Sequence, residues 1–262
     1  MPSKHRSPDY VDLKRPTIFA HRGSSAYAPE NTLAAFELAL DQGADAIELD
    51  VKLSVDGHVV VMHDDTVDRT TDGTGRVKSM SLKELMSLDA GSKFPPNFKP
   101  QKIPTLADVF QAVGGKIFIN VELTNYMSPH DDLPDRVISL VRKHNLESKV
   151  MLSSFNIMAL IMARNLLPMI PLAFLAYHGE AEATIHSRLI RFGPLMALHP
   201  AFSDVTNQLL QRAHGAKSRV HTYTVDKPEI MQQLITQGVD GIFTNDPVVA
   251  LRVLADYQVN NP

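Results

Sequence analysis

Short apolar runs alternate with helical patterns along most of the chain. The apolar runs are TIFAH at 17–21, DAIELDVKL at 45–53, VVVMHD at 59–64, KIFINVEL at 116–123, KVMLSSF at 149–155, PLAFLAY at 171–177, LMALHPAF at 195–202, RVHTYTVD at 219–226 and DGIFTND at 240–246. Because such runs are apolar on both faces and helical patterns follow most of them, they predict parallel strands covered by helices.

The helical patterns complete a series of strand–helix units. They are expected at Thr32–Gln42, Leu133–His144, Ile157–Leu166, around Ile185–Arg191, and at Thr206–Ala213, Glu229–Gln237 and Val248–Leu254. About eight such units in a chain of this length favour a closed (β/α)8 TIM barrel over an open sheet. The count allows DAIELDVKL and VVVMHD to form one barrel strand with an irregular partner. No GxGxxG pattern follows the first run, which argues against a dinucleotide-binding fold.

Two segments depart from this alternation. Residues 65–104 are rich in Gly, Pro, Thr and Lys, and we interpret them as an insertion on the rim of one barrel domain spanning 1–262. Residues 156–177 are apolar enough to resemble a membrane span, but Arg164, Pro168 and Pro171 interrupt them. We therefore expect a helix, a turn and a buried strand there, and no stable membrane insertion.

Composition narrows the class of protein. The formal net charge of -3 gives no overall reason to bind nucleic acid, so an anionic substrate has to be held locally. The chain has no cysteine, which excludes disulfides, thiolate metal sites and cysteine nucleophiles. The first residues, MPSKHRSPDYVDLKRPT, lack the apolar core of a secretory signal, and this predicts a cytoplasmic protein.

Acidic side chains stand where several predicted strands end, which is where a parallel barrel places its catalytic groups. Glu48 and Asp50 are two residues apart and share one face of a strand, and Glu122 ends a neighbouring run. If the three carboxylates converge, a divalent cation would neutralise them, and all-oxygen ligands suit Mg²⁺ or Ca²⁺. The alternative is that they are exposed acids with no common target.

Histidine and arginine side chains stand beside these acids. His21 and Arg22 follow the first run, and His63 follows VVVM. Two imidazoles can divide the roles of acid and base near neutral pH, and the guanidinium offers a fork of donors suited to a phosphate. Metal, arginine and paired histidines together suggest phosphoryl transfer.

A series of motifs resembles, in order and spacing, the glycerophosphodiester phosphodiesterase family. These motifs are HRG, PENT, ELDV, DGHVVVMHD, RTTDGTG, IPTL and GVDGIFTNDP, and they span Thr17 to Pro247. The resemblance implies a TIM barrel with a small inserted segment. It also implies metal-dependent hydrolysis of small-molecule glycerophosphodiesters to glycerol 3-phosphate and an alcohol.

The resemblance also implies roles for individual residues. His21 and His63 become the general base and acid, Glu48, Asp50 and Glu122 the metal ligands, and Arg22 a phosphate contact. Asn31 of PENT is expected to order its loop or touch the ligand, or alternatively to cap the helix that follows. Gly23 is expected to let the backbone pass close to a phosphate.

Three positions depart from the family pattern. Thr124 stands where the family has a lysine, Tyr223 replaces a tryptophan, and Asn245 replaces an aspartate. Tyr223 keeps an aromatic wall for the substrate. Lys52, two residues after Asp50, is our candidate for the missing cation, with a solvated lysine beyond the strand end as the alternative.

The expected reaction runs in two steps, with the substrate's own glycerol hydroxyl as nucleophile and a cyclic phosphate as intermediate. Two other functions remain open from the sequence. One is a phospholipase-D-like lyase that cleaves a choline or inositol phospholipid and stops at the cyclic phosphate. The other is a non-catalytic module that binds glycerophosphodiesters.

Overall fold

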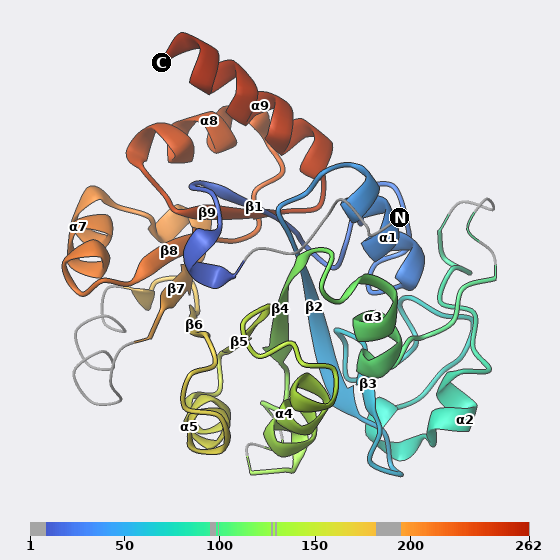
Figure 1. The fold of residues 1–262 in the computed structure, drawn as a ribbon. Helices are drawn as coiled ribbons and strands as arrows, with labels where there is room; N and C mark the ends of the chain where they lie inside the picture. The colour runs from blue at the N-terminus through green and yellow to red at the C-terminus, as the bar shows by residue number, and fades with distance from the viewer. Residues whose placement is uncertain are drawn as a thin grey trace, which may run out of the picture.

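The computed structural model describes residues 9–94, 98, 100–126, 128, 130–181 and 195–261. Its nine-stranded sheet contains eight parallel strands that close into a barrel, because β1 pairs with both β9 and β2. The barrel strands are β1 Thr17–Ala20, β2 Ala46–Leu53, β4 Phe118–Leu123, β5 Val150–Ser154, β6 Leu172–Ala176, β7 Ala197–Pro200, β8 Arg219–Thr222 and β9 Gly241–Thr244. The predicted (β/α)8 barrel is confirmed (Figure 1).

The remaining strand, β3 Val59–Val61, is not one of the eight barrel strands. It runs antiparallel to the end of β2, with Leu53 opposite Val59 and Val51 opposite Val61. A tight turn joins the two strands, and Gly57 supplies the positive φ of 79° within it. DAIELDVKL is therefore one barrel strand, and VVVMHD contains its irregular partner.

Helices cover the outside of the barrel (Figure 1). They are α1 Leu33–Asp41, α3 Leu106–Val113, α4 Leu133–Lys143, α5 Ile157–Leu166, α7 Asn207–Gly215, α8 Pro228–Gln237 and α9 Pro247–Asn260. The short helix α2 Leu82–Leu85 belongs to the segment between β3 and α3. Most bounds lie within two residues of the prediction. The expected helix around Ile185–Arg191 lies outside the described residues.

Two helices differ clearly from the prediction. Helix α9 continues to Asn260, beyond the expected end at Leu254. The prediction stopped too early because residues 255–260 are mostly exposed, and only Tyr257 among them packs against the core. Helix α3 was not predicted. It begins at a capping box in which Thr105 and Asp108 bond each other's backbone amides, and it buries Leu106, Val109, Phe110 and Val113 on one face.

The segment between β3 and α3 has a small apolar cluster of its own. The cluster includes Val60 of β3 together with Val67, Val77, Leu85 and Ile103. A bridge between Thr66 and Arg76 folds the segment back on itself. The segment therefore rests on the end of β3, beside the carboxyl ends of the barrel strands.

Two apolar layers hold the barrel together. The larger layer lies between the strands and the helices and includes Ile18, Phe36 and Ile47. The smaller layer fills the barrel, where the rings of Phe19 and Phe243 stack with centroids 4.5 Å apart. A filled interior leaves the ends of the strands as the place for a ligand.

The apolar segment 156–177 forms the predicted helix, turn and buried strand. Asn156 caps α5, and the chain then turns into β6, all of whose residues are buried. Across the described ranges, no helix combines the length and apolar character that a membrane crossing requires.

Candidate active site

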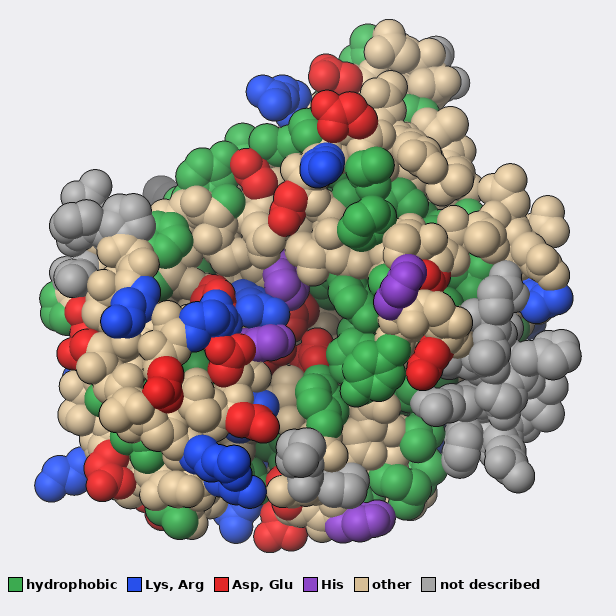
Figure 2. Space-filling model, turned by 180° about the vertical axis from the view of Figure 1, so that it is seen from behind, with side chains coloured by type: hydrophobic (Ala, Val, Ile, Leu, Met, Phe, Trp, Pro, Cys, Tyr) green, Lys and Arg blue, Asp and Glu red, His purple; other side chains and the backbone are tan. Residues whose placement is uncertain are grey.

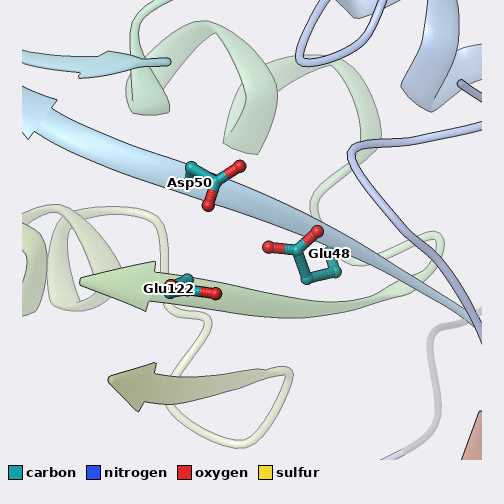
Figure 3. A group of neighbouring side chains, drawn as sticks. All are labelled: Glu48, Asp50 and Glu122. Atoms are coloured by element: carbon teal, nitrogen blue, oxygen red, sulfur yellow. The ribbon is translucent and has the colours of Figure 1, made fainter. Parts of the chain in front are cut away.

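Three carboxylates meet at the end of two adjacent strands. Asp50 of β2 lies directly opposite Glu122 of β4 in the parallel register, and Glu48 precedes Asp50 on the same face. One oxygen of each carboxylate lies within 4.8 Å of the others (Figure 3). The structure therefore brings together the acids that the sequence singled out.

Burial makes this cluster electrostatically costly without a cation. Burial and the neighbouring charges of Asp50 and Glu122 raise the pKa of Glu48 well above its usual value. Burial and Asp50 raise the pKa of Glu122 to about 8. Glu48 Oε1 is buried and has no hydrogen-bond partner among the described residues. Clustered oxygen ligands, repulsion between charges and an unpaired buried oxygen all fit a hard divalent cation such as Mg²⁺ or Ca²⁺.

Arg22 lies against the same acids. Its backbone amide donates to Glu48 Oε2 at 2.9 Å, and its guanidinium Nε lies 3.4 Å from Asp50 Oδ2. It also donates to Glu30 at 2.8 Å. Arg22 has a φ of 56°, which turns the chain sharply at the end of β1 and directs both its amide and its side chain to the acids.

A chain of ion pairs connects Arg22 with His63. Arg69 donates to both Glu30 and Asp64, and Asp64 in turn lies 2.6 Å from His63 Nδ1. The hydrogen bonds from Arg69 and His63 lower the pKa of Asp64 to about 2. The carboxylate of Asp64 is therefore ionised and orients the imidazole of His63. Sequence reasoning assigned no role to Arg69, although the residue opens the motif RTTDGTG.

His21 is held in one tautomer by Asn245. The Asn245 amide nitrogen donates to Asp226 at 2.7 Å, so its oxygen faces His21 Nδ1 at 2.8 Å and requires a hydrogen there. The other nitrogen, Nε2, is free to accept a proton and lies 3.9 Å from Glu48. Burial and the charge of Arg22 lower the pKa of His21 to about 4, so the ring is neutral at neutral pH.

The two histidines share one cavity. Its volume is about 240 Å³, and its lining includes His21, Arg22, Glu48, His63, Glu122, Phe155 and Tyr223. Figure 2, seen from behind the view of Figure 1, shows a hollow with acidic and histidine side chains in it. Basic side chains lie on one flank of this hollow and apolar side chains on the other.

Aromatic side chains form the apolar flank. Tyr223 donates its hydroxyl to the carbonyl of Ala176 at 2.8 Å, and its ring meets Phe155 edge-on. Tyr126 also contacts Phe155 and donates its hydroxyl to Glu122. The hydroxyl that distinguishes Tyr223 from tryptophan is thus directed to the backbone, and an aromatic wall remains.

One of the two alternatives for Asn31 is wrong. Asn31 does not cap α1, because the Thr32 side chain accepts the hydrogen bond from the Ala35 amide. The amide of Asn31 instead donates to Asp50 Oδ2 at 2.9 Å and orders the acidic cluster. A side chain at Gly23 would lie 2.6 Å from the Ala35 carbonyl carbon, so close packing against α1 also favours a glycine here. The expected approach of its backbone to a phosphate stays a prediction.

Lys52 of β2 and Thr124, the residue that follows β4, lie beyond the acids. Strand β2 continues to Leu53, so Lys52 is not a solvated residue past the strand end, and its side chain is 11% exposed. Its ammonium group donates to Asp65 at 3.0 Å and to the carbonyl of Thr124 at 3.4 Å. The hydroxyl of Thr124 donates to the carbonyl of Val51 and does not replace a cation.

Comparisons with known proteins agree with this geometry. Residues 21–249 match the model of the glycerophosphoryl diester phosphodiesterase family. A glycerophosphodiester phosphodiesterase of Caldanaerobacter subterraneus subsp. tengcongensis is 39% identical over 90% of this chain and 97% of its own length. The structure of an Oleispira antarctica phosphodiesterase in complex with the product sn-glycerol-3-phosphate is 31% identical, with a TM-score of 0.87 over 92% of this chain and 97% of that one. A glycerophosphodiester phosphodiesterase from Agrobacterium tumefaciens is 29% identical, with a TM-score of 0.79 over 90% and 99% of the two chains.

Proposed function

The chain belongs to the glycerophosphoryl diester phosphodiesterase family, and from that premise we propose that it hydrolyses glycerophosphodiesters with two histidines, a divalent cation and a cyclic phosphate intermediate. The observation that carries this proposal is the convergence of Glu48, Asp50 and Glu122 beside a neutral His21. The product bound to the similar Oleispira protein supports a glycerol phosphate as the ligand.

The acids would hold the cation, Mg²⁺ or Ca²⁺, while Asn31 keeps Asp50 in position. When bound, the cation would neutralise charge that builds on the phosphoryl oxygens. Arg22 would add a second positive charge on the same oxygens, because its guanidinium already lies beside Asp50. Lys52 would supply part of the positive potential that Thr124 cannot provide.

In the first step, His21 Nε2 would take the proton from the glycerol hydroxyl next to the phosphate. The hydroxyl oxygen would then bond to phosphorus as the bond to the alcohol breaks, which leaves a cyclic phosphate. His63, oriented by its hydrogen bond with Asp64, would give a proton to the departing alcohol oxygen.

In the second step, the roles would reverse. His63, now neutral, would take a proton from water, whose oxygen attacks phosphorus and opens the ring. His21, now protonated, would return its proton to the glycerol oxygen that leaves phosphorus. The products are glycerol 3-phosphate and a free alcohol, and both histidines regain their starting protonation states.

Phosphorus NMR of the reaction tests this proposal. We expect glycerol 3-phosphate as the final product, whereas a lyase would accumulate the cyclic phosphate and a binding module would release neither. A diester that lacks the adjacent hydroxyl tests the route. If it is hydrolysed as fast as glycerophosphoethanolamine, water attacks directly and the cyclic route is wrong.

A further inference from the structure

A second cavity lies beyond the acidic cluster, at the end of β2 and just past the end of β4. Its volume is about 220 Å³, and Lys52 and Thr124 form part of its lining. Each of these residues follows a proposed metal ligand by two positions, Lys52 after Asp50 and Thr124 after Glu122. Two residues of a strand advance about 6.6 Å, so this cavity begins roughly that far from the acids.

The lining of the second cavity is strongly basic. It contains Lys52, Arg76 and Lys78 against one carboxylate, Asp65, so three positive charges and one negative charge leave an excess of two positive charges. Asp65 already pairs with Lys52. Arg76 and Lys78 are exposed, and within the part of the chain that the structure describes neither has an ion-pair partner. The chain as a whole has a net charge of -3, so the net positive charge of this cavity is opposite in sign to that of the protein.

The spacing between the acids and the second cavity suits the leaving part of a substrate. A phosphodiester at the acids and Arg22 would extend from phosphorus into its alcohol through a few covalent bonds of about 1.5 Å each. A charged group at the end of such a short alcohol lies about 5 Å from phosphorus, comparable to the spacing between the acids and the second cavity. The fork of donors on Arg76 matches a carboxylate or a phosphate.

We propose that this basic cavity binds an anionic group on the departing alcohol, so that the preferred substrates are glycerophosphodiesters whose alcohol carries a carboxylate or a second phosphate. The inference rests on the proposed function, because the substrate phosphate has to lie at the acidic cluster. Arg76 and Lys78 would supply the free cations of this subsite.

A matched pair of substrates tests the subsite directly. Glycerophosphoserine and glycerophosphoethanolamine differ by one carboxylate on the leaving alcohol, and the readout is the ratio of their kcat/KM values. We expect the wild-type protein to favour glycerophosphoserine by about tenfold, the lower end for charge-assisted hydrogen bonds. Combining Arg76→Gln with Lys78→Gln should bring the ratio close to one. Added salt should lower the wild-type ratio, because both cations are exposed.

Lys83→Gln provides the matched control. Lys83 is an exposed cation on α2 in the same segment, and it is not part of the cavity lining. This variant should keep the wild-type ratio, while circular dichroism checks that all variants fold alike. A wild-type ratio near one, or a ratio that the double variant leaves unchanged, overturns the inference even while glycerol 3-phosphate is released. If neither diester releases glycerol 3-phosphate, the proposed function itself fails.

Discussion

Replacing Glu48 with glutamine should stabilise the metal-free protein near pH 8 and remove its response to divalent cations. Burial, Asp50 and Glu122 all disfavour the ionised form of Glu48 and raise its pKa. Glutamine has nearly the same shape, and its carbonyl oxygen can still accept the hydrogen bond that Glu48 receives from the Arg22 amide. The substitution therefore removes a repelled charge and a metal ligand while keeping the backbone contact.

The size of the effect follows from the pKa values of the cluster. The pKa of Glu122 rises from 4.5 to about 8 on folding. At about 1.4 kcal/mol for each pKa unit, this shift corresponds to roughly 5 kcal/mol of folding free energy. The figure is an upper bound, because Glu122 is only half-buried and solvent screens part of the interaction. The folded protein binds the proton of the Glu122 carboxyl group more tightly than the unfolded chain does. The stability that this proton contributes is therefore complete below about pH 4.5 and is lost as the pH rises through about 8.

Removing one charge from the cluster should recover part of that loss. We expect Glu48→Gln to gain about 2 kcal/mol near pH 8, which corresponds to roughly 4–8 °C in Tm for a chain of this size. Near pH 5, where protonation already relieves the repulsion, the gain should largely vanish. Mg²⁺ or Ca²⁺ should raise the Tm of the wild-type protein near pH 8 and leave that of the variant almost unchanged.

Thermal denaturation of chelator-treated protein, monitored by circular dichroism at both pH values, measures these differences. Glu37→Gln on α1 is the control, because Glu37 is exposed and is not one of the three clustered acids. It should show neither the pH-dependent gain nor a lost response to cations. The reasoning is wrong if Glu48→Gln is less stable than the wild type at both pH values, or if cations stabilise both proteins equally.

Further predictions concern catalysis and use steady-state release of glycerol 3-phosphate. His21→Ala and His63→Ala should each lower kcat by about 10² or more, the usual contribution of acid–base catalysis, and near-normal rates would exclude the assigned roles. Lys52→Ala should lower kcat/KM and Thr124→Lys should raise it, because both alter the positive potential near the phosphate; unchanged values would contradict this. Asn245→Leu should lower kcat with little change in KM, and nitrogen NMR should show that His21 no longer keeps its hydrogen on Nδ1; an unaltered tautomer would refute the positioning role.

The acidic cluster could be predicted from the sequence because one periodicity and one rule of barrel topology bring its residues together. Side chains two apart on a strand share a face, which brings Glu48 and Asp50 together. Parallel strands of a barrel end on the same side, which brings Glu122 to them. Neither step needs knowledge of side-chain conformations, and the structure places Asp50 directly opposite Glu122.

Contacts made by irregular backbone could not be predicted in this way. The bond from Asn31 to Asp50 depends on a φ of 58° at Asn31, and Arg69 reaches Glu30 from a segment without periodicity. Helix α3 is a different case, because its apolar residues recur at helical spacing. This helical spacing at Leu106–Val113, together with the capping-box residues Thr105 and Asp108, predicts the helix from the sequence alone.

Release of glycerol 3-phosphate by chelator-treated protein, before and after Mg²⁺ or Ca²⁺ is added back, tests the central claim most directly. We predict no turnover of glycerophosphoethanolamine after exhaustive chelation and recovery when either cation is restored, because the cation that Glu48, Asp50 and Glu122 would hold neutralises charge on the phosphoryl oxygens. Full turnover without a divalent cation would contradict the account, as would a complete lack of glycerol 3-phosphate in its presence.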